Sequence, residues 1–167
     1  IPFIPEIEFF VLGFLILVMA VYVLQFPQYR TDQVFASFVG VFYVAAMLSC
    51  IYRTREMEAG VYIVWLIFLC SWGSDTCAYC VGVLIGKHKM APKLSPKKSV
   101  EGAVGGIVGT ILLTILYGWI FMEQMGLTFK YVLILAGISG VGAVISMIGD
   151  LAASAIKRNY DVKDFGK

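Results

Sequence analysis

The sequence predicts an all-α protein, a polytopic transmembrane helix bundle of about five spans, because each span takes about 20 apolar residues. Hydrophobic residues make up 60% of the 167 residues and only 14% are charged, whereas a soluble domain carries about 25% charged residues. Unbroken apolar runs such as residues 11–24, VLGFLILVMAVYVL, lack the polar and apolar alternation of a transmembrane β-barrel. The sequence therefore indicates an integral membrane protein made of helices.

The expected spans are apolar runs separated by polar segments. A Pro-rich, acidic lead-in (1–8) precedes the first run, a polar loop (27–33) follows it, and a short charged loop (53–58) follows the second. Small and polar residues between positions 71 and 76 interrupt the third run. The spans are expected at residues 9–26, 34–52, 60–86, 100–122 and 131–153.

Two polar segments follow the third and fifth spans. One is a lysine-rich loop, residues 87–99 (KHKMAPKLSPKKS), and the other is the polar C-terminal segment 154–167. Basic residues gather in the cytoplasmic loops of membrane proteins. With the lysine-rich loop inside, alternation of the spans places loop 27–33 and the C-terminal segment inside as well, and divides the 13 Lys and Arg residues 10 to 3. We therefore expect the lysine-rich loop and the C-terminal segment at the cytoplasmic face.

Glycine spacing indicates which spans pack most closely. Glycines about four positions apart let helix backbones approach each other, and such spacing is denser in the later spans than in the first two. We therefore expect residues 1–60 to form peripheral N-terminal spans and residues 61–167 to form the closely packed membrane domain. Bundle packing alone is the alternative explanation for these glycines. They are Gly82, Gly86, Gly102, Gly105, Gly106, Gly109, Gly137, Gly140 and Gly142.

Two acidic residues, Asp75 and Asp150, lie in apolar runs, toward the end of the span nearer the expected cytoplasmic face. An unpaired charge in the hydrocarbon region costs several kcal/mol, so each must face the bundle interior, a cation or a polar cavity. The alternative is a buried ion pair that only fixes the helix register. Glu101 differs, because an acid at the start of the fourth span favours the positive end of the helix dipole. Capping alone would explain it equally well.

The lysine-rich loop has features of a phosphate site. Ser95-Pro96-Lys97-Lys98 has the form of a helix start, with Ser95 as the N-cap and Pro96 at the first helical position. A helix N-terminus attracts phosphate, and the two lysines add charge there. The alternative is a solvated lysine face that attracts anionic lipid headgroups. The chain lacks a G-x-x-x-x-G-K-[ST] motif, so it is not a P-loop protein. His88 is expected to be a loop residue rather than a catalytic base.

Two motifs, one in residues 75–102 that contains Asp75-Thr76 and Ser95-Pro96-Lys97-Lys98, and one in residues 154–166 that contains Lys157-Arg158 and Lys163-Asp164, resemble the phosphatidate cytidylyltransferase (CDP-diacylglycerol synthase) family. The segment 75–102, DTCAYCVGVLIGKHKMAPKLSPKKSVEG, is similar to the family pattern of D-T-x-A-Y, a G-K-H-K-like stretch and S-P-K-K-[ST]-x-E-G. Ser154 to Arg158 and Lys163 to Gly166 follow the signature S-x-hydrophobic-K-R-x4-K-D-x-G. The resemblance covers about residues 75–167, and the first two spans match only as membrane helices.

The chain also departs from the family pattern. Many members carry an acid where this chain has Ala153. The family signature continues into an H-G-G stretch and a D-R-x-D pair, and the chain ends at Lys167, before either of them. We therefore expect a fragment that lacks the C-terminal end of the signature, and an H-G-G stretch and a D-R-x-D pair in the reading frame beyond Lys167 would complete the family pattern.

The resemblance implies a nucleotidyltransferase in phospholipid biosynthesis. Phosphatidate and CTP would give CDP-diacylglycerol and pyrophosphate, with Mg²⁺ or another divalent cation and room for a second cation. The implied partners are CTP, phosphatidate and membrane lipid, without nucleic acid, and a homodimer is one arrangement that the family pattern allows. The implied location is a bacterial cell (inner) membrane, with the active face cytoplasmic.

The resemblance also implies roles for individual residues. Asp150 is the leading metal ligand, and Asp75 is a weaker candidate. Lys97 and Lys98 would neutralise the charge of the CTP triphosphate and of the pyrophosphate that leaves, so that Asp150 and these two lysines form the catalytic set. The residues expected to contact substrate are Ser95, Glu101, Lys157, Arg158, Lys163 and Asp164.

Two other functions remain open at this stage. An ion-coupled membrane transporter would use Asp75 and Asp150 as intramembrane sites, but it leaves the paired lysines unexplained. Such transporters often contain internal repeats, and we find none in the sequence. A non-catalytic scaffold that binds anionic lipids through its lysines would not need Asp150.

Overall fold

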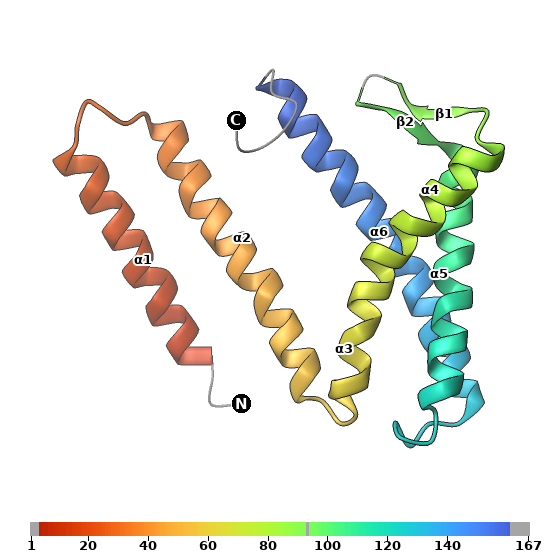
Figure 1. Cartoon of the computed structure of the whole chain (residues 1–167). Helices are drawn as coiled ribbons and strands as arrows, with labels where there is room; N and C mark the ends of the chain where they lie inside the picture. The colour runs from red at the N-terminus through yellow and green to blue at the C-terminus, as the bar shows by residue number, and fades with distance from the viewer. Residues whose placement is uncertain (1–3, 93, 161–167) are drawn as a thin grey trace. The chain divides into compact units, whose positions relative to one another are not determined.

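The all-α prediction is confirmed by a computed structural model, which describes residues 4–92 and 94–160 (Figure 1). Four described helices are long and apolar enough to cross a membrane: Thr31–Glu56, Gly60–Ile85, Val100–Phe121 and Phe129–Asn159. A shorter apolar helix, Phe9–Leu24, lies where the first span is expected. The predicted count of about five spans therefore corresponds to four long helices and one shorter one.

The elements follow one another along the chain with short connections. In order they are α1 (Ile4–Leu24), α2 (Thr31–Glu56), α3 (Gly60–Phe68), the π-helix η1 (Leu69–Gly73), α4 (Ser74–Ile85), β1 (Lys89–Ala91), β2 (Ser95–Ser99), α5 (Val100–Phe121) and α6 (Phe129–Asn159). The chain divides into two compact units, Ile1–Arg53 and Thr54–Lys167.

In the first unit, α1 packs against α2. The Phe14 and Phe38 rings stack with their centroids 6.1 Å apart, and the Tyr22 hydroxyl lies 3.0 Å from Thr31 Oγ1. The residues expected to carry the function belong to the second unit. The functional division into peripheral spans 1–60 and a domain 61–167 stays a prediction.

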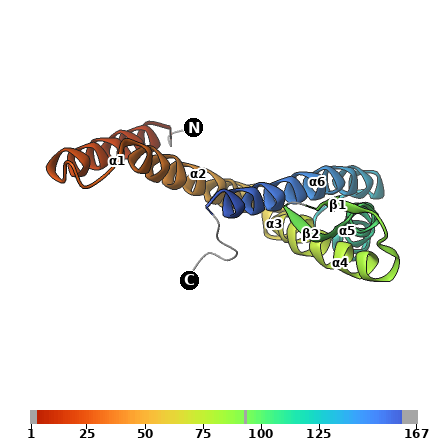
Figure 2. The ribbon, with the colours of Figure 1, turned by 90° about the horizontal axis from the view of Figure 1, so that it is seen from above.

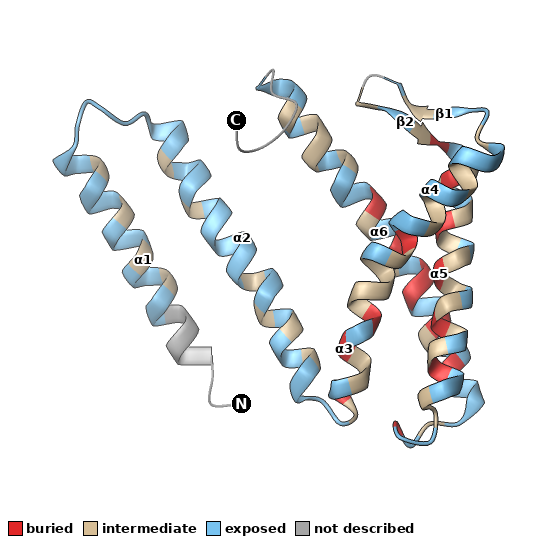
Figure 3. Cartoon of the chain, viewed as in Figure 1, coloured by how far each residue is buried: buried red, intermediate tan, exposed pale blue. Residues whose placement is uncertain are grey.

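The second unit packs α4, α5 and α6 through small side chains. The buried residues of α5 recur every four positions, as Gly102, Gly106, Thr110, Thr114 and Gly118, and this row appears in red in Figure 3. A Cβ added at Gly106 would lie 2.8 Å from the Ser74 carbonyl oxygen of α4. The prediction that glycines of the fourth span let helices approach closely is therefore confirmed for α5. Gly137 differs, because a Cβ added there would have nothing within 4 Å.

We expect Gly106→Leu to destabilise the protein, whereas Gly137→Leu should not. Overpacking a close contact costs about 1–3 kcal/mol. At Gly106 the opposing atoms are the flexible Met147 Cε and the main-chain oxygen of Ser74, and the oxygen cannot rotate away. Gly137 is exposed, and replacing glycine in a helix gains up to about 1 kcal/mol. Thermal unfolding in detergent micelles measures both variants. Equal midpoints for the two would contradict the assigned packing.

The interruption predicted in the third run is a π-helix, η1, between α3 and α4. Hydroxyl groups bond carbonyls at this wide turn: Ser74 Oγ donates to Ser71 O at 2.9 Å, and Thr76 Oγ1 donates to Trp72 O at 2.8 Å. π-turns of this kind are frequent at functional sites. Here the turn directly precedes Asp75, which lies in the first turn of α4.

The predicted helix start at Ser95 is wrong. Residues Ser95–Ser99 form β2, which pairs antiparallel with β1, so the lysine-rich loop is largely a β-hairpin. Pro96 is tolerated because a two-stranded hairpin consists only of edge strands. Helix α5 begins at Val100, and its N-cap is Ser99, whose hydroxyl accepts from Gly102 N at 3.1 Å. The strand pairing uses main-chain groups that a helix start at Ser95 would need.

The polar C-terminal segment is also more helical than expected. Helix α6 continues to Asn159, so Lys157 and Arg158 lie in its last turn, where cations favour the negative end of the helix dipole. Figure 2 looks along the second unit from the end that carries the hairpin, where β1 and β2 lie beside α4 and α5. Lys163 and Asp164 lie outside the described residues.

Candidate functional site

A cleft of about 630 Å³ lies between α4, the hairpin, α5 and α6. One part of its lining is charged or polar, and the other part is apolar. The charged and polar residues are Asp75, Lys89, Ser95, Lys97, Lys98, Ser99 and Asp150, and the others are Ala78, Tyr79, Gly82, Val83, Met90, Gly102, Ala103 and Met147. Such a lining suits a ligand with a charged head and an apolar body.

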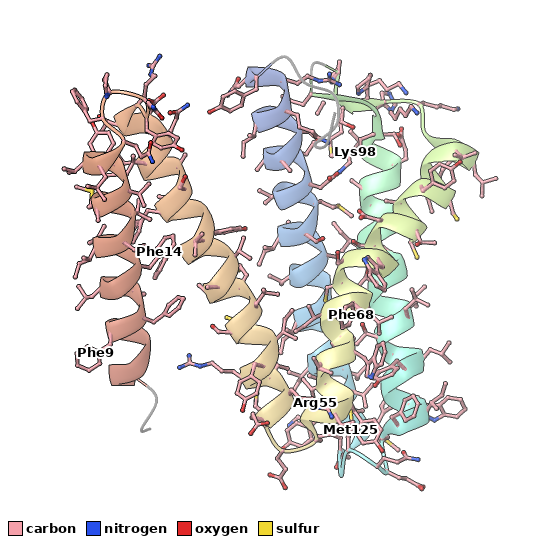
Figure 4. The ribbon with its side chains drawn as sticks, turned by 60° about the vertical axis from the view of Figure 1, so that its left-hand side comes forward. Phe9, Phe14, Arg55, Phe68, Lys98 and Met125 are labelled. Atoms are coloured by element: carbon pink, nitrogen blue, oxygen red, sulfur yellow. The ribbon has the colours of Figure 1, made fainter. Side chains whose placement is uncertain are left out.

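An ion pair between Lys98 Nζ and Asp150 Oδ2 crosses this cleft. Lys98 reaches from the hairpin toward α6 (Figure 4), and the two residues are 52 positions apart in the sequence. The contact places Asp150 and the lysine-rich hairpin at the same end of the second unit. The Asp150 side chain is 51% exposed, so a ligand in the cleft can reach it.

Asp75 lines the same cleft from the first turn of α4. No Lys or Arg of the described segments forms an ion pair with it. The cleft therefore holds two carboxylates, of which Asp150 has a cationic partner. In the part of the chain that the structure describes, no group of three or more His, Cys, Asp and Glu residues could hold a metal.

Three lysines bring positive charge to the cleft: Lys89 from β1 and Lys97 and Lys98 from β2. Ser95 and Ser99 add hydroxyl groups beside them. Ammonium groups held by a strand pair are well suited to bind a polyanion, because charge-assisted hydrogen bonds are stronger than neutral ones. The arrangement can hold a phosphorylated ligand next to two carboxylates.

Glu101 is placed differently from the other predicted site residues, since it is not part of the cleft lining. Its carboxylate accepts hydrogen bonds from the main-chain N–H groups of Lys87 and His88, each at 3.1 Å to Oε2. The His88 ring nitrogen Nδ1 lies 2.5 Å from Glu101 Oε1. His88 is thus a loop residue, as predicted, and its ring contacts the first turn of α5.

Among the remaining predicted residues that the structure describes, Lys157 and Arg158 are not part of the cleft lining. Lys157 and Arg158 occupy the last turn of α6, about 10 Å beyond Asp150 along the helix at a rise of 1.5 Å per residue. The apolar lining was not predicted. Positions 75, 78, 79, 82 and 83 of α4 recur at intervals of three and four, the spacing of one helix face, so this face could have been found from the sequence.

Comparison of the sequence with known proteins identifies one family and several relatives that share a name. The model of the cytidylyltransferase family matches residues 3–167. The phosphatidate cytidylyltransferase of Bacillus subtilis (strain 168) is 31% identical over 155 residues, which cover 92% of this chain and 56% of the relative. That of Staphylococcus saprophyticus is 35% identical over 130 residues, 77% of this chain and 47% of the relative. That of Staphylococcus aureus (strain COL) is 29% identical over 129 residues, with the same coverage of 77% and 47%.

The chain spans about half the length of the curated relatives it matches. These comparisons confirm the resemblance found in the sequence motifs.

Proposed function

Because the chain belongs to the cytidylyltransferase family, we propose that the protein transfers a cytidylyl group from CTP to phosphatidate, giving CDP-diacylglycerol and pyrophosphate. The observation that carries the proposal is the contact between Lys98 and Asp150, which joins the lysine hairpin to an acidic residue of a membrane helix in one cleft. The relatives reported above are all named phosphatidate cytidylyltransferases. Neither the cleft nor these relatives favour the transporter alternative.

In the proposed reaction, the residues of the chain mainly position groups and neutralise charge. An oxygen of the lipid phosphate forms a bond to the α-phosphorus of CTP, and the bond from that phosphorus to the bridging oxygen breaks. The electron pair of that bond leaves with pyrophosphate. Such phosphoryl chemistry depends on in-line placement and on charge stabilisation. The lipid phosphate is already ionised near neutral pH, so no residue of the chain has to remove a proton.

The hairpin lysines serve the nucleotide in this proposal. Lys97 and Lys98, supported by Lys89, would hold the triphosphate and the pyrophosphate leaving group, and Ser95 would donate its hydroxyl to a phosphate oxygen. Preorganised cations next to developing negative charge are among the strongest contributions to catalysis. Lys157 and Arg158, in the last turn of α6, are proposed to bind the lipid phosphate or CTP. Lys163 and Asp164 keep the roles that the family resemblance implies.

The residues present fit a divalent cation of the Mg²⁺ type. Mg²⁺ is commonly held by one or two carboxylates together with substrate phosphates, and Asp75 and Asp150 line a cleft that is also lined by lysines. Asp150 is the leading ligand and Asp75 the second. When bound, such an ion would supply positive charge that neutralises the phosphate groups of the substrates. A second cation and a homodimer stay predictions.

The chain is an integral membrane protein, with four described helices long and apolar enough to span. We propose that the end with the hairpin faces the cytoplasm of a bacterial cell, at the inner membrane. Two points support this: Lys and Arg divide 10 to 3 in favour of that side, and CTP is a cytosolic compound. The apolar lining, with Tyr79, Val83 and Met147, would then receive the lipid from the bilayer.

Reconstitution of the full-length protein tests the proposal. Vesicles that contain phosphatidate, given radiolabelled CTP and Mg²⁺, should form a lipid that carries the cytidylyl label, and pyrophosphate in equal amount. Vesicles of phosphatidylcholine alone and ATP in place of CTP serve as controls. The proposal is wrong if the labelled lipid does not form, or if it forms equally without phosphatidate.

A further inference from the structure

A cluster of hydrogen bonds joins the hairpin that carries the cleft lysines to the first turn of α5. Glu101, in the first turn of α5, accepts from the main-chain N–H groups of Lys87 and His88. In the reverse direction, Val100 N donates to His88 O at 2.9 Å. Residues 87–88 directly precede β1, and residues 99–101 directly follow β2 or end it. Both ends of the hairpin are therefore attached at the same place.

The hairpin needs such an attachment because its own pairing is short. β1 has three residues and β2 has five, and an isolated two-stranded hairpin is at best marginally stable in water. The register is also irregular between Lys89 and Ala91. The direction in which Lys89, Lys97 and Lys98 point therefore depends on what holds the two ends of the hairpin.

Glu101 itself does not belong to the cleft lining. Both of its carboxylate oxygens lie within 3.3 Å of donors on residues 87 and 88, namely the two main-chain N–H groups and the His88 ring. The Glu101 side chain is only 23% exposed. A carboxylate used in this way has little capacity left for a substrate or a cation in the cleft.

We propose that Glu101 is a positioning residue for CTP: it acts through the hairpin, by holding the cleft lysines where the triphosphate binds, and does not touch substrate or metal. This inference rests on the proposed function. It replaces the substrate contact that the family resemblance implies for Glu101. Hydrogen bonds to a charged group contribute more than neutral ones, so loss of the carboxylate should loosen the hairpin while α5 keeps its N-cap, Ser99.

Four variants of the full-length protein separate this role from a direct one. Glu101→Ala removes all the contacts, and Glu101→Asp withdraws the carboxylate by one methylene. Glu101→Gln keeps an oxygen that accepts from main-chain N–H groups. His88→Ala removes only the ring contact and is the matched control. For each, we would measure KM for CTP and for phosphatidate, kcat, the Mg²⁺ dependence, and hydrogen exchange of the amides of residues 87–99.

Glu101→Ala should raise KM for CTP roughly ten- to a hundred-fold, the range expected for charge-assisted hydrogen bonds, and should speed amide exchange across the hairpin. KM for phosphatidate, kcat at saturating CTP and the Mg²⁺ requirement should change less than about three-fold, because the reacting groups keep their partners. Glu101→Asp should fall between Glu101→Ala and the unmodified protein. Glu101→Gln should also fall between them, because it keeps one accepting oxygen without the charge, and its Mg²⁺ requirement should not change. His88→Ala should stay close to the unmodified protein.

Several results would overturn the inference. One is an unchanged KM for CTP in both Glu101→Ala and Glu101→Asp, and another is a loss confined to kcat. A Glu101→Gln variant as impaired as Glu101→Ala, with a raised Mg²⁺ requirement, would show a metal ligand instead. If Glu101→Ala does not fold, Glu101→Asp and Glu101→Gln decide, and an unchanged KM for CTP in both would overturn the inference. If the unmodified protein makes no labelled lipid, the proposed function fails, while hydrogen exchange still tests whether Glu101 holds the hairpin.

Discussion

Replacing Asp150 by asparagine in the full-length protein is expected to lower kcat/KM for CTP roughly a thousand-fold or more, since a metal-held phosphate contributes several kcal/mol. Asparagine has nearly the same size, so packing in α6 should be kept. The amide lacks the negative charge that pairs with Lys98 and that would bind a divalent cation. The measurement is the rate of labelled lipid formation at varied CTP and Mg²⁺.

The matched control for this variant is Asp32→Asn. Asp32 also pairs with a basic residue, Arg30 at 3.1 Å, but both side chains are highly exposed, and such surface pairs contribute at most about 1 kcal/mol. Activity should therefore be unchanged in the control. Near-normal product formation by Asp150→Asn would contradict the proposed role of Asp150 as a metal ligand.

Replacing Lys98 by methionine is expected to lower kcat/KM for CTP about a hundred-fold, because one preorganised cation next to the triphosphate is lost. Most of this change should be a higher KM for CTP. Methionine keeps most of the length of the side chain. Lys130→Met is the control, since Lys130 is exposed at the start of α6 and is not part of the cleft lining. Initial rates at varied CTP, with saturating phosphatidate, separate KM from kcat.

The double variant Lys98→Met with Asp150→Asn distinguishes a functional pair from a structural one. If the ion pair only fixes the register of α6 against the hairpin, each single variant leaves one charge without its partner. Removing both charges should then restore activity, and a double-mutant cycle measures this coupling. If each residue has its own role in the reaction, the double variant stays inactive. Recovery of activity in the double variant would contradict the assignment of both residues to the active site.

The sequence predicts the helical spans well because hydrophobicity is a local property. Expected and observed limits of the fourth span, for example, are 100–122 and Val100–Phe121. The interruption before Asp75 is also visible in the sequence, as small and polar residues at 71–76, although its form as a π-helix is not. The start of α5 is harder to predict from the sequence, because a serine at position 95 or at position 99 could be the N-cap. The pairing of residues 95–99 with residues 89–91 leaves Ser99 as the N-cap.

Composition and motif order are sufficient to assign this chain to membrane helices, to a family and to a set of candidate residues, since each depends on residue types and on their spacing. The pairing of Lys98 with Asp150, 52 residues away, and the use of Glu101 by the main chain of residues 87–88 are different. They depend on how α4, α5 and α6 pack and on where the hairpin folds back. Contacts between distant segments arise from that packing, and no local pattern of residues specifies them.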